Sequence, residues 1–352
     1  MEERIPDLWE GIQAQIKVVG IGSAGNNALN RMIREGIDGV EFIAMNTDVQ
    51  ALSKCLAPQK LNLGPKLTRG LGAGLDPEKG KAAAEESVEE IKKLLEGADL
   101  VFITAGLGGG TGTGASPIVA RVAKDLGALV VAVVSKPHAF IEGTTRYKIA
   151  EEGLRQLAEH VDALIPISNE SIFKMGNSDM TLDQAFSLGD QVLMQGVKGI
   201  SEIILKPGFI NVDFADVRMV LENAGTAVMG IGSATGDNRA EKAAQQAISS
   251  PLLEFRPTGA SRLLYNITVK PGNITTKDIT SIAEIFQQIV SDDALIKFGV
   301  VYDEELEDSK IEVTLIASEF KNETTRTASF GASKEQPVKE VKRVTIPEIF
   351  NR

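Results

Sequence analysis

Short apolar runs alternate with segments of helical periodicity along the first half of the chain. The apolar runs occupy residues 16–19, 40–45, 98–105, 129–134 and 163–169. A continuous run such as 129–134 is typical of a parallel strand that is covered on both faces. Small and apolar residues at helical spacing follow two of these runs, at 26–34 and 116–126. The pattern predicts an α/β unit built on a Rossmann-like parallel sheet.

The second half of the chain begins with one long predicted helix over residues 181–205, where Thr181 and Gln184 form a plausible capping box. Beyond residue 217 the pattern becomes mixed. Four strands are predicted at 227–234, 262–269, 296–302 and 311–317, with one helix over 239–250 and another that Thr276 caps and that runs to about Val290. We find no chemistry in the residue types of this smaller α+β unit and expect it to serve packing and contact.

Three glycine-rich segments are the main candidates for chemistry, at residues 20–25, 68–77 and 106–114. Glycines leave backbone N–H groups free to converge on an anion, and a following helix adds the partial positive charge of its N-terminus. The segment at 106–114 stands between a predicted strand and a predicted helix, and Thr111 and Thr113 add hydroxyl donors. It predicts a phosphate-binding loop, with a flexible surface turn as the alternative.

A dinucleotide-binding fold is a rival interpretation of the first glycine segment. Residues 20–25 read G-x-G-x-x-G directly after a strand, and Asp48 stands where a ribose-binding acid is expected. That interpretation predicts an NAD(P)-dependent oxidoreductase. Three glycine loops suit a nucleoside triphosphate held from several sides better than a single pyrophosphate.

Charge and composition exclude several classes of function. The formal net charge is −11 and no basic stripe is present, which argues against a nucleic-acid partner. The single cysteine, Cys55, excludes an internal disulfide and fits a reducing cytoplasm. No run approaches the roughly 18 apolar residues of a membrane span, so we expect a soluble cytoplasmic protein with no direct membrane insertion.

The order Gly108-Gly109-Gly110-Thr111-Gly112-Thr113-Gly114 resembles the signature of the tubulin/FtsZ superfamily. The chain is similar to the FtsZ family of bacterial cell-division GTPases from about Ile16 to Phe320, and residues 46–52 match that family residue for residue. The resemblance implies a Rossmann-like GTPase domain that a long central helix joins to a smaller α+β domain. It also implies GTP and GDP as ligands, Mg²⁺ as cofactor, and head-to-tail polymerisation of the protein with itself.

The resemblance divides the chain into seven parts. These are a flexible N-terminal extension (1–11), a GTP-binding domain (12–180), the central helix (181–205), a synergy loop with catalytic aspartates (206–216), a C-terminal α+β domain (217–320), a disordered linker (321–338) and a partner-binding peptide (339–352). The peptide contains an apolar island, Val344–Phe350, that resembles the segment with which FtsZ proteins bind membrane tethers such as FtsA at the mid-cell division site. The alternative is a tail without a partner.

Nucleotide contacts follow from the same resemblance. The expected phosphate-binding residues are Gly22, Ser23, Ala24, Gly72, Ala73, Gly74, Gly108, Gly109, Gly110, Thr111, Gly112 and Thr113. The expected base contacts are Asn26, Phe186 and Asp190, and the expected sugar contacts are Glu142, Arg146 and Asn169. The loop at 137–143 carries one residue more than the family pattern, which bears on Glu142.

Residue chemistry gives the base contacts a physical reason. Phe186 and Asp190 lie four apart and share one face of the long helix. Phe186 can stack on a purine, and the Asp190 carboxylate can accept both N–H groups on the Watson–Crick edge of guanine. The alternatives are that Phe186 is a core residue and Asp190 is solvated, and that Glu142 and Arg146 form an ordinary i,i+4 helix pair.

Asn211, Asp213 and Asp216 match the synergy loop and are the predicted catalytic residues. The alternative is that the two aspartates only cap a helix. The long helix separates them from the nucleotide by roughly 35 Å. The family resolves this by placing them at the γ-phosphate of the next subunit, and such a head-to-tail contact generates filaments. A non-catalytic filament-forming relative would lack the acidic pair.

Overall fold

The computed structural model describes residues 14–175, 180–206, 208–250, 253 and 255–320. Four expectations lie outside these ranges: the N-terminal extension, the helix break at Pro207, the linker, and the C-terminal peptide with Val344–Phe350. Within the described residues no helix is both long enough and apolar enough to cross a membrane.

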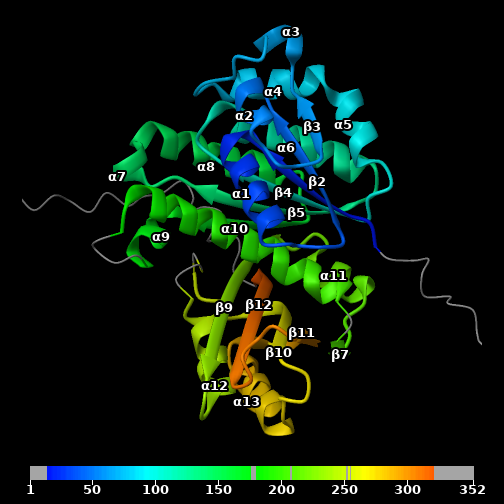
Figure 1. Ribbon diagram of the computed structural model, residues 1–352, viewed down its shortest axis with the longest axis vertical. Helices are drawn as coiled ribbons and strands as arrows, with labels where there is room; N and C mark the ends of the chain where they lie inside the picture. The colour runs from blue at the N-terminus through cyan, green and yellow to red at the C-terminus, as the bar shows by residue number, and fades with distance from the viewer. Residues whose placement is uncertain (1–13, 176–179, 207, 251–252, 254, 321–352) are drawn as a thin grey trace, which may run out of the picture. The chain divides into compact units, whose positions relative to one another are not determined.

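The first of two sheets is the predicted parallel one (Figure 1). The described residues give it seven strands, and every strand pairing in it is parallel. Its order is β3 (Gln59–Asn62), β2 (Val40–Asn46), β1 (Ile16–Ile21), β4 (Leu100–Gly106), β5 (Leu129–Lys136), β6 (Ala163–Ser168) and β8 (Gly225–Thr226). The direction of winding reverses between β1 and β4, and the carboxyl ends of strands beside such a switch point are where ligands bind in open α/β sheets.

Alternate residues of the central strands enter two different cores. In β5, Leu129, Val131 and Val133 face one side and Val130, Ala132 and Val134 face the other. The first side is covered chiefly by α1 (Gly22–Arg34) and α10 (Leu182–Leu205), and the second by α4 (Pro77–Glu86), α5 (Val88–Leu95), α6 (Gly110–Asp125) and α8 (Thr144–Ala158). Burial on both faces explains why these strands are apolar throughout.

The second sheet has five described strands, not the four that the sequence predicts. Its order is β7 (Gly208–Ile210), β11 (Val290–Tyr302), β10 (Ala260–Val269), β12 (Lys310–Phe320) and β9 (Val228–Thr235). The additional strand, β7, comes from the segment expected to be the synergy loop, and it pairs with β11. Helices α12 (Arg239–Ile248) and α13 (Thr276–Gln287) pack on this sheet.

The predicted bounds of α13 were wrong at both ends. Thr275, not Thr276, is the cap, because its hydroxyl accepts from the Asp278 N–H while the Asp278 carboxylate accepts from the Thr275 N–H. The helix ends at Gln287, because Val290 already pairs with Ala260 as the first residue of β11.

Helix α10 lies between the two sheets (Figure 1). Its Val197 and Ile200 share one core with Leu264 and Ile316 of the second sheet. The capping box of Thr181 and Gln184 is present, which confirms the predicted start of the helix. The structure also contains elements that the sequence analysis did not predict, namely β3, β8, α2 (Val49–Ser53), α3 (Pro65–Thr68), α5, α7 (Ala139–Glu142), α8 and α9 (Asn169–Met175). Helix α11 (Phe214–Leu221) begins after Asp213, where the sequence indicated the start of a helix.

Candidate functional site

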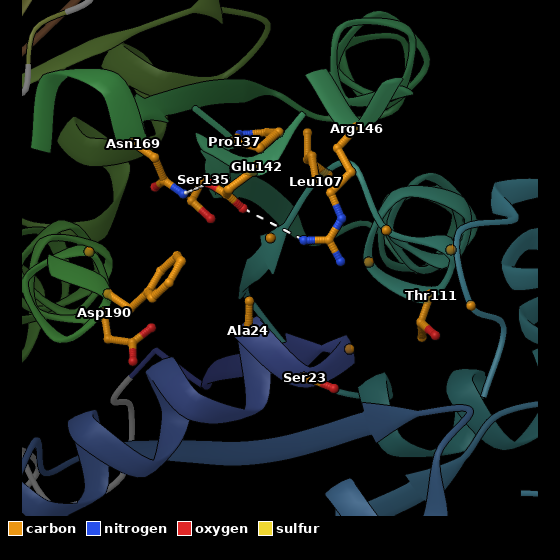
Figure 2. A pocket seen from close by; sticks show the side chains of 18 residues that line it. Ser23, Ala24, Leu107, Thr111, Ser135, Pro137, Glu142, Arg146, Asn169 and Asp190 are labelled. Carbon is orange, nitrogen blue, oxygen red and sulfur yellow. Dashed lines mark hydrogen bonds and ion pairs between the residues drawn. The ribbon is translucent and has the colours of Figure 1, made fainter. Parts of the chain in front are cut away.

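A pocket of about 360 Å³ opens at the carboxyl ends of the central strands (Figure 2). Gly22 follows β1, Gly106 ends β4, Ser135 lies near the end of β5, and Asn169 follows β6. The lining residues are Gly22, Ser23, Ala24, Gly74, Gly106, Leu107, Gly109, Gly110, Thr111, Gly112, Ser135, Pro137, Glu142, Arg146, Asn169, Phe186, Gly189 and Asp190. Figure 2 shows Asp190 and Thr111 at opposite ends of the pocket.

Two helix N-termini meet at the Thr111 end. Helix α1 begins at Gly22 and α6 at Gly110; neither has an acidic residue in its first turn or a side-chain cap. The first N–H groups of a helix have no partner within the helix, and together they favour an anion. A Cβ atom at Gly109 or Gly74 would meet nothing within 4 Å, so these residues leave open space beside the two N-termini. This arrangement fits a chain of phosphates.

The glycine loop is shorter than predicted, because α6 begins at Gly110 and not after Gly114. A Cβ atom at Gly112 would overlap the carbonyl oxygen of Gly106, and one at Gly114 would overlap that of Pro77. These two glycines are therefore required where α6 packs closely against β4 and α4. Gly112 also lines the pocket, whereas Gly114 does not.

The predicted base-binding pair, Phe186 and Asp190, comes from α10. Phe186 is 41% exposed and lies edge-on to Phe173, with 6.2 Å between the ring centroids. Burial raises the pKa of Asp190 to about 6, although Arg31 acts in the opposite direction. Both residues line the pocket. The alternative of a core phenylalanine and a solvated aspartate is therefore wrong.

The three predicted sugar contacts lie together on one side of the pocket (Figure 2). Asn169 Nδ2 donates to Glu142 Oε1 over 2.8 Å, and Arg146 Nη1 lies 3.7 Å from Glu142 Oε2. Glu142 ends α7 and Arg146 belongs to α8, because Gly143, at φ 98°, separates the two helices. They are an i,i+4 pair in sequence, but they do not lie on a single helix.

Five predicted nucleotide contacts do not line the pocket: Asn26, Gly72, Ala73, Gly108 and Thr113. Asn26 is buried; its Nδ2 donates to the Gly20 carbonyl and its Oδ1 accepts from Asn46, each over 2.8 Å. These hydrogen bonds therefore stabilise the first glycine turn without placing Asn26 in the pocket. The Thr113 hydroxyl accepts from the Gly108 N–H over 2.8 Å and holds the third glycine loop in the same way.

Asp48 argues against the dinucleotide interpretation. Its carboxylate caps α2 by accepting from the N–H groups of Gln50 and Ala51, and it does not line the pocket. Asp48 is therefore not placed as the ribose-binding acid that the dinucleotide interpretation requires.

Sequence reasoning named no individual contact for five lining residues, Gly106, Leu107, Ser135, Pro137 and Gly189, although the first two lie in the predicted phosphate-binding loop. Gly106 ends β4, and Ser135 and Pro137 lie at the end of β5, so their place at the carboxyl edge of the sheet could have indicated them. Gly189 directly precedes Asp190 on α10, and only its lack of a side chain hints at a role beside a ligand.

The predicted catalytic residues lie beyond the other end of α10. Asp213 caps α11 by accepting from the Asp216 N–H over 2.8 Å, so the capping alternative correctly describes this contact. The Asp216 Oδ1 lies 2.6 Å from Lys297 Nζ, and Asn211 Oδ1 accepts from the Gly208 N–H. None of the three lines the pocket. The 24 residues of α10 span about 36 Å, so the structure does not bring them to the pocket of the same subunit.

Comparisons with known proteins agree with this geometry. Residues 15–177 match the GTPase domain of the tubulin/FtsZ family, and residues 225–321 match the C-terminal domain of the FtsZ family. The cell division protein FtsZ of Pseudomonas aeruginosa is 48% identical over 329 residues, which cover 93% of this chain and 80% of that protein.

Solved structures show the same fold. An empty FtsZ dimer from M. jannaschii is 41% identical, with a TM-score of 0.84 over 96% of each chain. CetZ2 from Haloferax volcanii, a protofilament with GTPγS bound, is 20% identical and shares the fold, with a TM-score of 0.73 over 90% of this chain and 96% of that one. The pocket is lined mainly by residues of the matched GTPase domain and is completed by α10, and the chain belongs to the FtsZ family.

Proposed function

We propose that this protein polymerises head-to-tail when it binds GTP and hydrolyses GTP at the contact between subunits. The observation that carries the proposal is the separation of binding and catalytic groups. The carboxylates that line the pocket are Glu142 and Asp190; the first is engaged by Asn169 and Arg146, and the second lies at the end opposite to Thr111. Asp213 and Asp216 lie beyond the far end of α10. A second subunit would supply the missing carboxylates.

Binding would use the two ends of the pocket differently. Phe186 would stack on the guanine and Asp190 would accept its two N–H groups, while Glu142, Arg146 and Asn169 would contact the sugar. The N-termini of α1 and α6 would hold the phosphates. The described residues contain no cluster of His, Cys, Asp or Glu suited to a metal ion. The hydroxyls of Ser23 and Thr111 are the side-chain groups at the phosphate end that would hold Mg²⁺, which would offset the charge of the triphosphate.

Hydrolysis would require a positioned water at the γ-phosphate. Asp213 and Asp216 of the neighbouring subunit would orient this water and accept its proton as its oxygen bonds to the γ-phosphorus. The bond from that phosphorus to the β–γ bridging oxygen breaks, which yields GDP and phosphate. Such a site is complete only in the polymer. A head-to-tail contact that does not close generates filaments.

The relatives suggest the cellular role. The Pseudomonas aeruginosa relative is a cell division protein, and the M. jannaschii structure is a dimer. We propose that the filaments form a septal scaffold in the cytoplasm at mid-cell. The apolar island Val344–Phe350 would bind a membrane-tethering protein such as FtsA.

The first experiment separates assembly from turnover. Light scattering of the protein with Mg²⁺ and GTP should rise, decay as GTP is consumed, and stay flat with ATP. Asp213→Ala should still bind GTP and polymerise but release phosphate very slowly, because the attacking water loses its carboxylate. Asp237→Ala, which removes an exposed carboxylate in the turn before α12, is the control and should behave as wild type.

Mixing tests whether the site is shared. Asp213→Ala mixed with Asp190→Asn, at a GTP concentration that fills only the Asp213→Ala pocket, should release more phosphate than either variant alone, because the Asp190→Asn subunit supplies intact aspartates to the nucleotide of its neighbour. Normal phosphate release by Asp213→Ala polymers would overturn the assignment of the catalytic carboxylates.

A further inference from the structure

We propose that Lys297 is a positioning residue of the shared catalytic site, where it fixes the Asp216 carboxylate and offsets its charge against the triphosphate of the neighbouring subunit. The inference rests on the proposed function. It concerns a lysine in β11, far from Asp216 in sequence and outside the GTP-binding pocket.

The ion pair that carries the inference is short and accessible. Lys297 Nζ lies 2.6 Å from Asp216 Oδ1, and the two side chains are 32% and 26% exposed. Partial burial leaves these two side chains less conformational freedom than those of a fully exposed ion pair have. Their partial exposure leaves them within reach of a second molecule. A second subunit could therefore approach Asp216 without unfolding any element.

Strand β11 holds the catalytic segment at two points. Ahead of Asn211, β7 pairs with β11 through Ile210 opposite Val300 and Gly208 opposite Val301. After Asp213, the ion pair ties the first turn of α11 to Lys297 on the same strand. The segment between these two points carries both Asn211 and Asp213. Its conformation should therefore depend on Lys297 as well as on the backbone pairing.

The contacts continue from Lys297 to Asp213. The Asp216 side chain binds Lys297, and the Asp216 backbone N–H donates to Asp213 Oδ1 over 2.8 Å. Lys297 therefore acts on Asp213 only through Asp216, which makes it a positioning residue.

Charge gives Lys297 its second role. The proposed contact brings two carboxylates, Asp213 and Asp216, toward a triphosphate, and like charges that meet across an interface oppose association. The Lys297 ammonium offsets one of the two. Without it the subunit contact should weaken, most strongly at low ionic strength, where charges are screened least.

The experiment compares Lys297→Met with Lys310→Met. Lys310 is a matched control, because its Nζ also lies 2.6 Å from a carboxylate, that of Glu312, with side-chain exposures of 31% and 38% in the same sheet. The polymerisation threshold is measured by sedimentation with a slowly hydrolysed GTP analogue at low and high salt. We expect the polymerisation threshold of Lys297→Met to rise several-fold at low salt and by less at high salt, and that of Lys310→Met to stay unchanged.

Turnover gives a second measurement. Phosphate release per polymerised subunit should fall about tenfold in Lys297→Met, as for a misplaced catalytic group, while GTP binding to the monomer stays unchanged. Lys297→Arg should keep a polymerisation threshold and a rate of phosphate release close to those of the wild type. A positioning role also predicts that Lys297→Met combined with Asp216→Asn is no slower than Asp216→Asn alone.

The outcomes separate the two proposals. If Asp213→Ala and Asp216→Asn polymers release phosphate normally, the proposed function fails. If those variants are slow but Lys297→Met matches Lys310→Met in threshold and turnover, only the role of Lys297 is overturned. A double variant that is much slower than Asp216→Asn would also overturn it, because Lys297 would then act independently of Asp216.

Discussion

At Asp190, burial favours the protonated carboxyl, whereas recognition of guanine would require the ionised carboxylate. Burial raises its pKa to about 6, so in the nucleotide-free protein it is ionised only above that pH. Guanine presents two N–H donors. An ionised carboxylate can accept both hydrogen bonds, one on each oxygen, whereas a protonated carboxyl carries an O–H donor on one oxygen and accepts them less well. Arg31 lowers the same pKa and so favours the form that binds.

This residue predicts a pH dependence of nucleotide binding. As the pH falls through about 6 toward 5, Asp190 takes up a proton that guanine binding must remove, so GTP affinity should fall by up to about tenfold per pH unit. Calorimetric titration between pH 5 and pH 8 measures this. Asp190→Asn should bind GTP about 100-fold more weakly at pH 7 and lose the pH dependence, because its amide cannot accept both N–H groups.

Xanthosine triphosphate supplies the control for this prediction. Its ring carries an oxygen where guanine carries the amino group, so it offers an acceptor to the amide of the Asp190→Asn variant. That variant should therefore bind xanthosine triphosphate better than it binds GTP. Equal GTP affinity in wild type and Asp190→Asn would show that Asp190 does not recognise the base.

At the scale of elements, the glycines at the start of α6 have two different functions. Gly109 faces open space in the pocket, whereas Gly114 contacts the start of α4, where a Cβ atom would overlap the Pro77 carbonyl oxygen and lie 2.6 Å from the Lys81 nitrogen. One glycine leaves room for a ligand and the other leaves room for a helix.

Two alanine substitutions should separate these functions. Gly114→Ala should lower the free energy of unfolding by about 1–3 kcal/mol, because the added methyl group forces α4 and α6 apart. Gly109→Ala should leave that free energy nearly unchanged, since its φ of −101° suits alanine, but should weaken GTP binding. Urea denaturation and nucleotide titration of both variants measure the difference. Equal destabilisation by the two would contradict the distinction.

The sequence predicted most long elements well and short ones poorly; α8, with 15 residues, is a long helix that it missed. Strands such as β5 are continuous apolar runs, because both faces are buried, and α10 carries a clear capping box. Strands β7 and β8 have three and two residues, too few for any hydrophobic pattern, so the second sheet was predicted with one strand too few.

The site was predicted best where one side chain has one evident role. Phe186 and Asp190 line the pocket, as their spacing on the helix indicated. Asn26 does not, because its partners, Gly20 and Asn46, are brought beside it only by the fold. The glycines were ambiguous for the same reason: the sequence does not show which neighbour each one must accommodate.

At the scale of the whole molecule, the packing of α10 against both sheets leads us to expect cooperative unfolding. Its residues share one core with both sheets, so neither sheet can lose its packing alone. Calorimetry of the nucleotide-free protein should show one transition with equal calorimetric and van't Hoff enthalpies, and GDP should raise the temperature of the entire transition. Two transitions, of which GDP shifts only one, would contradict this prediction.

The chain crosses between the two sheets more than once after α10. Strand β7 completes the edge of the second sheet beside β11, and the chain then returns to the first sheet, where β8 pairs with β6. Residues 217–320 expressed alone would carry β8 away from its sheet and leave β11 with a bare edge, because β7 lies outside that range, and a bare strand edge invites aggregation. A division of the chain between residues 216 and 217 therefore takes one edge strand from each of the two sheets.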